Sequence, residues 1–199
     1  MAAEKPYVEQ CKGVNGLDKV ILREVRGCSA EVYLYGGQVT SWKNEYGEEL
    51  LFLSSKETFR PPKPIRGGIP ICFPQFRNLG TLEQHGFARN QFWSVDPDPP
   101  PFPTSTSSRA FVDLILRHSE DDVKIWPHRY EFRLRVALGP GGDLMLTSRI
   151  RNTNTDGKPF TFTFTYHTYF AVSDIRFPYL SYNSLVRKIC LESMHPDMP

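Results

Sequence analysis

The sequence has few cysteines, and no two of them lie close together. Cys11, Cys28, Cys72 and Cys190 are spread through the 199-residue chain and form no CxxC pair. Paired or clustered cysteines are the signal of disulfide frameworks and zinc sites, so neither is expected here. Widely spaced free thiols suit a reducing compartment, and we expect a cytoplasmic protein.

The chain also lacks the apolar runs that membrane insertion and secretion require. No run approaches the ~20 apolar residues of a membrane span, and the opening MAAEKPYVEQ has no apolar core of a secretory signal. Charge of one sign is not in excess, since 24 Lys and Arg stand against 22 Asp and Glu. We therefore expect neither a membrane nor a nucleic acid as partner, and any affinity for an anion must come from a local cluster.

Convincing amphipathic helix patterns are absent as well, and alternating strand patterns take their place. Short strands are predicted at Val20 to Val25, Ala30 to Tyr35 and Leu50 to Leu53. Longer ones are predicted at Arg109 to His118, Arg129 to Leu138, Asp143 to Asn152 and Pro159 to Phe170. The last three are separated by a GPGG turn and an Asp-Gly turn, which predicts an antiparallel meander. The fold class is therefore all-β, a sandwich or an open barrel in one domain.

Two proline-rich segments interrupt the strands. Residues 59–76 read FRPPKPIRGGIPICFPQF, and their prolines and paired glycines exclude a regular helix or a central strand. Because the segment still holds Ile, Phe and Cys, we expect a long structured loop of the kind that often contacts ligands. Residues 96–108, DPDPPPFPTSTSS, are interpreted as a mobile surface excursion without chemistry of their own.

The segment PFTFTFTYHTYF, from Pro159 to Phe170, alternates aromatic and polar residues. In a strand, Phe160, Phe162, Phe164 and Tyr166 share one face, which must be the core face. Threonines and His167 share the other face. By pattern alone that face is either an ordinary solvated sheet face or a polar cleft, and Tyr169 beside His167 favours a cleft that holds a sugar.

Three further motifs are uninformative singly and specific together. RGGIPICFPQF, QHGFARNQFW and YHTYF occur in this order, preceded by GGQVTSW. By composition alone, Arg66 and Arg89 are solvated or structurally paired arginines, and His85 is a hydrogen-bonded loop histidine. In this order, the motifs resemble the aldose 1-epimerase (galactose mutarotase-like) superfamily, and within it the glucose-6-phosphate 1-epimerase branch.

The resemblance implies a fold, an activity and a set of residues. The fold is a large antiparallel β sandwich with a sugar cleft on one sheet face. The activity is interconversion of the α and β anomers of a hexose or its 6-phosphate, without a metal or organic cofactor. Carried over by motif, His167 is the catalytic acid, and Arg66, Gln84 and Arg89 bind substrate. His85 is expected to contact the sugar.

The resemblance runs from roughly Val20 to Ile175. It implies that residues 1–175 are the N-terminal part of a sandwich domain, and that residues 176–199 are a divergent tail of a truncated or variant form. The family base, a glutamate on a later strand, has no counterpart in that tail. Glu192 and Asp197 are expected to be solvated carboxylates, and His195 a surface residue.

Two functions therefore stay open. The first is an isomerase that opens the ring of a hexose 6-phosphate by acid–base catalysis. The second is an inactive sugar-phosphate-binding remnant that lacks the base. A third possibility, a carbohydrate-binding module on a similar sandwich, is disfavoured by the ordered motifs. In either leading case we expect a monomer whose partner is a small-molecule hexose 6-phosphate.

Overall fold

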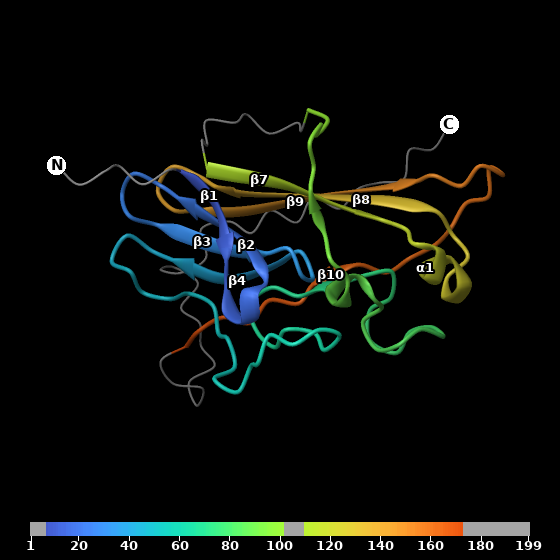
Figure 1. Cartoon of the computed structure of the whole chain (residues 1–199), viewed down its shortest axis with the longest axis horizontal. Coiled ribbons are helices and arrows are strands. Elements are labelled where there is room, and N and C mark those ends of the chain that lie inside the picture. The colour runs from blue at the N-terminus through green and yellow to red at the C-terminus, as the bar shows by residue number, and fades with distance from the viewer. Residues whose placement is uncertain (1–6, 102–109, 173–199) are drawn as a thin grey trace.

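A computed structural model describes residues 7–101 and 110–172, and nearly all of its regular structure is antiparallel strand (Figure 1). One short helix, α1 (Glu120–Ile125), begins at a capping box formed by Ser119 and Asp122. Two 3-10 turns occupy Val14–Gly16 and Ala88–Asn90. The strands are β1 (Val8–Lys12), β2 (Asp18–Arg23), β3 (Ser29–Tyr33), β4 (Gln38–Lys43), β5 (Ile71–Cys72), β6 (Ser94–Val95), β7 (Ala110–Arg117), β8 (Tyr130–Leu138), β9 (Leu144–Asn152) and β10 (Thr165–Tyr166).

Two four-stranded sheets pack face to face, as Figure 1 shows. The first has the order β1-β2-β3-β4 and the second the order β6-β7-β8-β9. One buried cluster joins their facing sides, with Val20, Leu22 and Val32 from the first sheet and Phe132 and Leu134 from the second. The alternation of apolar residues places one set of side chains in this core. The predicted all-β sandwich is confirmed.

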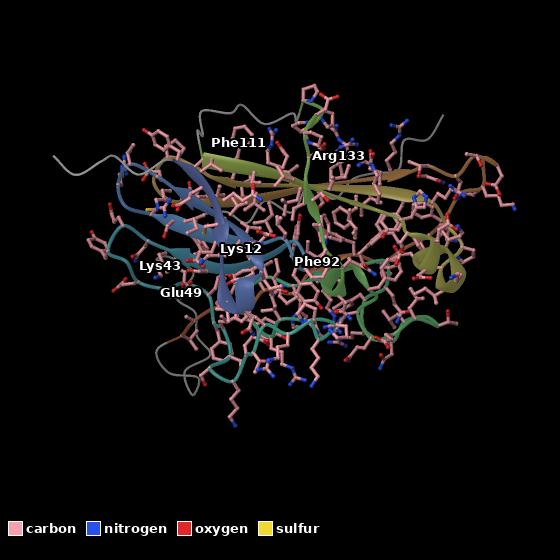
Figure 2. The ribbon with its side chains drawn as sticks, viewed as in Figure 1. Lys12, Lys43, Glu49, Phe92, Phe111 and Arg133 are labelled. Carbon is pink, nitrogen blue, oxygen red and sulfur yellow. The ribbon has the colours of Figure 1, made fainter. Side chains whose placement is uncertain are left out.

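The second sheet follows its sequence pattern closely. The predicted strands at 129–138 and 143–152 correspond to β8 and β9, which pair along their full lengths. On the outer face, Arg135 donates two hydrogen bonds of 2.8 Å to Asp113 and lies over the ring of Phe111. Figure 2 shows Phe111 along this sheet. The buried ion pair of Arg135 and Asp113 therefore covers part of this outer face.

The prediction that Pro159 to Phe170 forms the third strand of a meander is wrong. In the order β6-β7-β8-β9, β9 is an edge strand that pairs with β8 alone among the described strands. Only Thr165 and Tyr166 of the segment form a strand, β10, which pairs with β5. The segment nevertheless runs antiparallel to residues 68–74 over a greater length. Amide groups of Thr163, His167 and Tyr169 donate to carbonyl oxygens there.

Proline explains why this ladder is short. Thr163 donates to the carbonyl oxygen of Pro74, and His167 to that of Pro70, at 3.0 Å each. Neither proline has an N–H group to donate in return. Each pair is thus half formed, and the regular ladder survives only at Thr165 opposite Cys72 and Tyr166 opposite Ile71.

The proline-rich segment 59–76 is a loop, as predicted, but it is not confined to the surface. Residues 67–75 are all buried, and β5 lies among them. Leu50 to Leu53, predicted as a strand, forms only isolated bridges, Leu51 to Phe170 and Leu53 to Gly67. The sequence patterns predicted no strand at β1 or at β4, although all of β4 except Lys43 lies within the GGQVTSW motif.

The remaining predictions fall at the edges of the described residues. In the excursion 96–108, Asp96 is buried and paired with Arg133 at 2.7 Å, and residues 102–108 lie outside the described part. The tail 176–199, with Glu192, His195 and Asp197, also lies outside it. Between residues 7 and 172, apart from the gap at 102–109, no helix combines the length and apolarity that crossing a membrane requires.

Candidate active site

The segment around His167 is fixed by its backbone. The His167 amide donates to the carbonyl oxygen of Pro70, and the Tyr169 amide to that of Gly68 at 2.9 Å. Phe164 and Tyr166 turn inward and pack against the core. Phe160 does the same, whereas Phe162 is half-exposed with its ring centroid 5.4 Å from that of Phe73. Alternation then directs His167 and Tyr169 to the opposite, outer face.

His85 reaches the same place from a different loop. Its ring centroid is 5.5 Å from that of His167. The loop passes close beneath the chain at Phe73, where the amide groups of Phe87 and Ala88 both donate to the Phe73 carbonyl oxygen. A Cβ on Gly86, whose φ is +68°, would lie 2.3 Å from that oxygen. Glycine is therefore required next to His85, because any side chain would push the loop away.

The Arg77 segment fixes the orientation of the His85 ring. The Arg77 amide donates to Nδ1 of His85 at 3.2 Å, and the His85 amide donates to the Arg77 carbonyl oxygen at 3.1 Å. A neutral ring that accepts at Nδ1 carries its proton on Nε2. Neutral His85 can therefore donate a hydrogen bond from Nε2, but it cannot accept a proton at that atom.

Burial lowers the pKa of the His85 imidazole below its ordinary 6.5, and the positive charges of Arg89, His167 and Arg77 act in the same direction. Because the unfolded chain binds this proton more readily, folding stability falls as pH falls below 6.5. We predict that His85→Asn makes the free energy of unfolding less dependent on pH in this range. Asparagine keeps an acceptor for the Arg77 amide and tolerates the positive φ of residue 85, which is +70°. Urea midpoints measured between neutral and mildly acidic pH at constant ionic strength check it, and parallel curves for both proteins would contradict it.

Arg89 lies partly buried in the turn Ala88–Asn90. One terminal nitrogen, Nη2, donates to the Gln84 carbonyl oxygen at 2.7 Å, while Nε is buried without a hydrogen-bond partner. Burial lowers the pKa of the Arg89 guanidinium, and the positive charge of Arg66 lowers it further, against opposing effects of Cys72, Tyr169 and Glu83. An anion bound near both guanidinium groups would relieve the mutual repulsion of Arg66 and Arg89.

The structure brings most of the predicted residues together. The rings of His85 and His167 lie side by side, and Arg89 bonds the carbonyl oxygen of Gln84, the residue before His85. The positive charge of Arg89 acts on His85, and that of Arg66 acts on Arg89. Arg66 is exposed, and its backbone amide donates to the Glu57 carboxylate at 2.7 Å. Gln84 is exposed too, and it accepts the hydrogen bond from Arg89 with its backbone carbonyl oxygen rather than with its side chain.

Tyr169 is part of the same arrangement and was noted from the sequence only as a neighbour. Its ring centroid lies 4.8 Å from that of His167, and the residue is 39% exposed. Both its amide and its carbonyl are engaged, since the Phe52 amide donates to the Tyr169 carbonyl oxygen. The period-two alternation from His167 was the signal that placed it here.

Among residues 7–101 and 110–172, no group of three or more His, Cys, Asp or Glu side chains is arranged to hold a metal ion. The ring of His85 lies beside those of Phe76 and His167, and the ring of His167 lies beside that of Tyr169.

The chain resembles known proteins in sequence and in fold. The family model for aldose 1-epimerase matches residues 18–187. A protein of Cenchrus ciliaris named "Putative glucose-6-phosphate 1-epimerase" is 72% identical over 170 residues, which are 85% of this chain and 52% of that protein. A protein of the same name from Escherichia coli is 30% identical, over 85% of this chain and 56% of its own length.

Solved structures agree with the sequence comparison. A crystal structure described as a putative mutarotase from Salmonella typhimurium has a TM-score of 0.57 and 28% identity, covering 70% of this chain and 45% of that one. A galactose mutarotase-like protein from Clostridium acetobutylicum, 18% identical with a TM-score of 0.57 over 73% of this chain and 49% of its own, shares the fold. The chain spans about half the length of the curated relatives that it matches. It belongs to the aldose 1-epimerase family and groups there with proteins named glucose-6-phosphate 1-epimerase.

Proposed function

We propose that this chain binds a hexose 6-phosphate and catalyses interconversion of its α and β anomers. One observation carries the proposal: the rings of His85, His167 and Tyr169 follow one another, with centroids 5.5 Å and 4.8 Å apart, and Arg89 bonds the carbonyl oxygen of Gln84, the residue before His85. Histidine supplies a proton near neutral pH, and arginine supplies a permanent charge for phosphate. The names of the related proteins support the same substrate.

The chemistry is the opening and closing of the pyranose ring. In the forward step, protonated His167 donates its proton to the ring oxygen, the bond between C1 and that oxygen breaks, and the C1 hydroxyl loses its proton to solvent water. The resulting aldehyde rotates about its bond to C2 and is attacked on its other face by the hydroxyl that was the ring oxygen. That hydroxyl returns its proton to His167, and C1–O⁻ regains one from solvent, so the cycle balances.

His85 and Tyr169 serve in this proposal as orienting groups. The Nε2–H of neutral His85 donates to a sugar oxygen, since its Nδ1 is occupied by Arg77. Tyr169 presents an exposed ring beside His167, against which the apolar face of a sugar can lie. Gln84, if its exposed side chain turns toward the ligand, can both donate to and accept from a hydroxyl.

The second candidate function is sugar-phosphate binding without catalysis, and one observation favours it. Within the described residues, no hydrogen bond or ion pair joins a carboxylate to His85 or His167, so a base for the C1 hydroxyl is not among their partners. Solvent water can take that proton, and one positioned transfer from His167 still accelerates the reaction by roughly 10²–10⁴. Measurement of anomer exchange therefore separates the two functions.

Phosphate recognition by Arg66 and Arg89 gives a separate prediction. Replacing Arg89 by glutamine removes a charge-assisted donor worth about 1.5–3 kcal/mol, so the affinity for glucose 6-phosphate should fall about 10–100-fold. The weaker affinity for glucose should not change, because glucose lacks the phosphate. Isothermal titration of both sugars checks this.

Arg60→Gln is the control, because Arg60 is an exposed arginine of the proline-rich segment that also contains Arg66, and its loss should leave both affinities intact. Equal affinities of the unaltered chain for glucose and glucose 6-phosphate would show that Arg66 and Arg89 do not bind the phosphate.

A further inference from the structure

Strand β4 contains a bulge within the GGQVTSW motif. Glu31 of β3 lies opposite Ser41, but the next residue, Val32, lies opposite Val39, which leaves Thr40 without a partner. In a regular strand Thr40 and Ser41 would point to opposite faces. The extra residue instead lets both side chains lie on the outer face of the sheet.

The inner face keeps its packing across this bulge. Val39 is fully buried in the core, and Trp42, opposite Ala30, packs against the same cluster. The irregularity therefore changes what the outer face presents without disturbing the core. Bulges are typical of places where a side chain is re-aimed next to a functional site.

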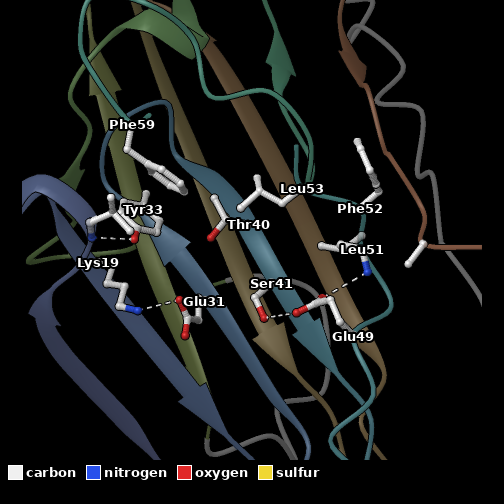
Figure 3. Close-up of a pocket in the computed structure, with 13 residues that line it drawn as sticks. Lys19, Glu31, Tyr33, Thr40, Ser41, Glu49, Leu51, Phe52, Leu53 and Phe59 are labelled. Atoms are coloured by element: carbon white, nitrogen blue, oxygen red, sulfur yellow. Dashed lines mark hydrogen bonds and ion pairs between the residues drawn. The ribbon is translucent and has the colours of Figure 1, made fainter. Parts of the chain in front are cut away.

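A basin of about 540 Å³ lies over the bulge, on the outer face of the first sheet. Figure 3 shows Lys19, Glu31 and Ser41 along its sheet side, and the Thr40 hydroxyl pointing into it. The aromatic and aliphatic side chains of Phe59, Leu53 and Phe52 form the other wall. A volume in this range and a wall that is polar on one side and apolar on the other suit a small amphipathic ligand.

The charges of the basin are largely satisfied by one another. The Lys19 ammonium lies 2.6 Å from the Glu31 carboxylate. The Glu49 carboxylate accepts from the Ser41 hydroxyl and from the amide groups of Trp42 and Leu51. One lysine against two glutamates leaves the lining with a formal charge of −1. A phosphate is therefore repelled here, in contrast to the arginines of the candidate active site.

Tyr33 adds a hydroxyl to the same basin. Its oxygen accepts from the Val14 amide at 3.1 Å, which leaves its own O–H available to donate. Gly13 makes room for this phenol, because a Cβ at that position would lie 2.3 Å from the phenolic oxygen. Tyr33 and Thr40 thus line the basin with two neutral hydroxyl groups, and the Tyr33 ring packs on Phe59 with the centroids 4.8 Å apart.

We propose that this basin is a second binding site, for an uncharged pyranose. A pyranose has hydroxyl groups around its rim, which match Tyr33, Thr40 and the Lys19–Glu31 pair, and an apolar C–H face, which matches Phe59 and Leu53. None of the residues proposed for the active site lines the basin. The basin and the proposed active site are neighbours along the backbone: Phe52 bonds to Tyr169 and Gly68, and Leu53 forms a bridge with Gly67, next to Arg66.

Titration of the isotope-labelled chain with methyl α-D-glucoside, followed by two-dimensional NMR of its amides, tests the proposal. This glucoside carries no phosphate and cannot change anomer. We expect saturable shifts at the amides of Tyr33, Thr40 and Ser41. Thr40→Val, which keeps the shape and removes the hydroxyl, should weaken the glucoside affinity about 3–10-fold, the effect of one neutral hydrogen bond.

His85→Asn, which removes the proposed donor to a sugar oxygen in the candidate active site, should leave the glucoside affinity unchanged, because His85 does not line the basin. Ser41→Ala provides a second variant of the basin, and peak dispersion in the same spectra shows whether each variant is folded. Shifts confined to His85, His167 and Tyr169, or an affinity lost in His85→Asn and kept in both basin variants, would overturn the proposal. So would the absence of saturable shifts up to the solubility limit of the glucoside.

Discussion

Replacing His167 by asparagine should slow anomer exchange of glucose 6-phosphate by roughly 10²–10⁴-fold, toward the rate in buffer. Asparagine keeps a polar side chain of similar size but cannot donate a proton to the ring oxygen. The backbone bond from His167 to Pro70 does not depend on the side chain, so the segment should keep its place. Affinity for the substrate should be retained, because the phosphate contacts are assigned to Arg66 and Arg89.

His128→Asn is the matched control for this variant. His128 is a half-buried histidine whose ring packs on Trp126 and Phe160, away from the proposed acid. Exchange rates from NMR line shapes or saturation transfer, together with titration of glucose 6-phosphate, give both quantities on each variant. Exchange in His167→Asn as fast as in the unaltered chain would exclude His167 as the acid.

Replacing Gly68 by alanine should destabilise the fold by about 2–5 kcal/mol. Gly68 has φ +64°, and a Cβ there would lie 2.2 Å from the Val39 carbonyl oxygen and 3.0 Å from the Thr40 Cα. The Gly68 amide donates to Phe52 and its carbonyl accepts from Tyr169. Backbone on both sides leaves no flexible group to move, so the substitution must separate strand segments that hold the candidate site.

Gly157→Ala isolates the steric part of this effect. Gly157 has φ +69°, close to that of Gly68, but nothing lies within 4 Å of its Cβ position. Its replacement should cost only the left-handed conformation, about 1–2 kcal/mol. Urea unfolding of both variants gives the difference. Equal losses at the two positions would mean that residues 68 and 39 do not approach each other as described.

The strand predictions succeeded where side-chain alternation decides the structure. β8 and β9 match their predicted ranges to within a residue at each end, because their apolar residues have one core to face. The prediction for residues 159–170 was wrong because its partner could not be read from its own pattern. The alternation identified the inward Phe164 and Tyr166 correctly, but the pairing depends on Pro70 and Pro74, about 90 residues away.

The residues of the candidate site could not be brought together from local sequence patterns alone. Polar alternation placed His167 on an outer face, and only the resemblance connected it with His85 and Arg89. Their proximity comes from a loop that requires Gly86 beneath Phe73 and a turn that half buries Arg89. The role of the Gln84 side chain stays a prediction, since the described contact of Gln84 is made by its backbone.

The basin over β4 was not predicted from the sequence at all. A bulge adds one residue to a strand without changing its composition, so the letters VTSW do not show that Thr40 and Ser41 share a face. Likewise, the charge balance of Lys19, Glu31 and Glu49 arises from three separate segments. Such features depend on register between strands, which short-range patterns do not encode.

Anomer exchange of α-glucose 6-phosphate in the presence of the unaltered chain tests the central proposal most directly. We predict conversion to the β anomer faster than in matched buffer, at a rate proportional to protein concentration, and loss of this acceleration in His167→Asn. Conversion at the buffer rate, with glucose 6-phosphate bound as shown by titration in the same samples, would contradict catalysis by this chain and leave it a sugar-phosphate-binding protein.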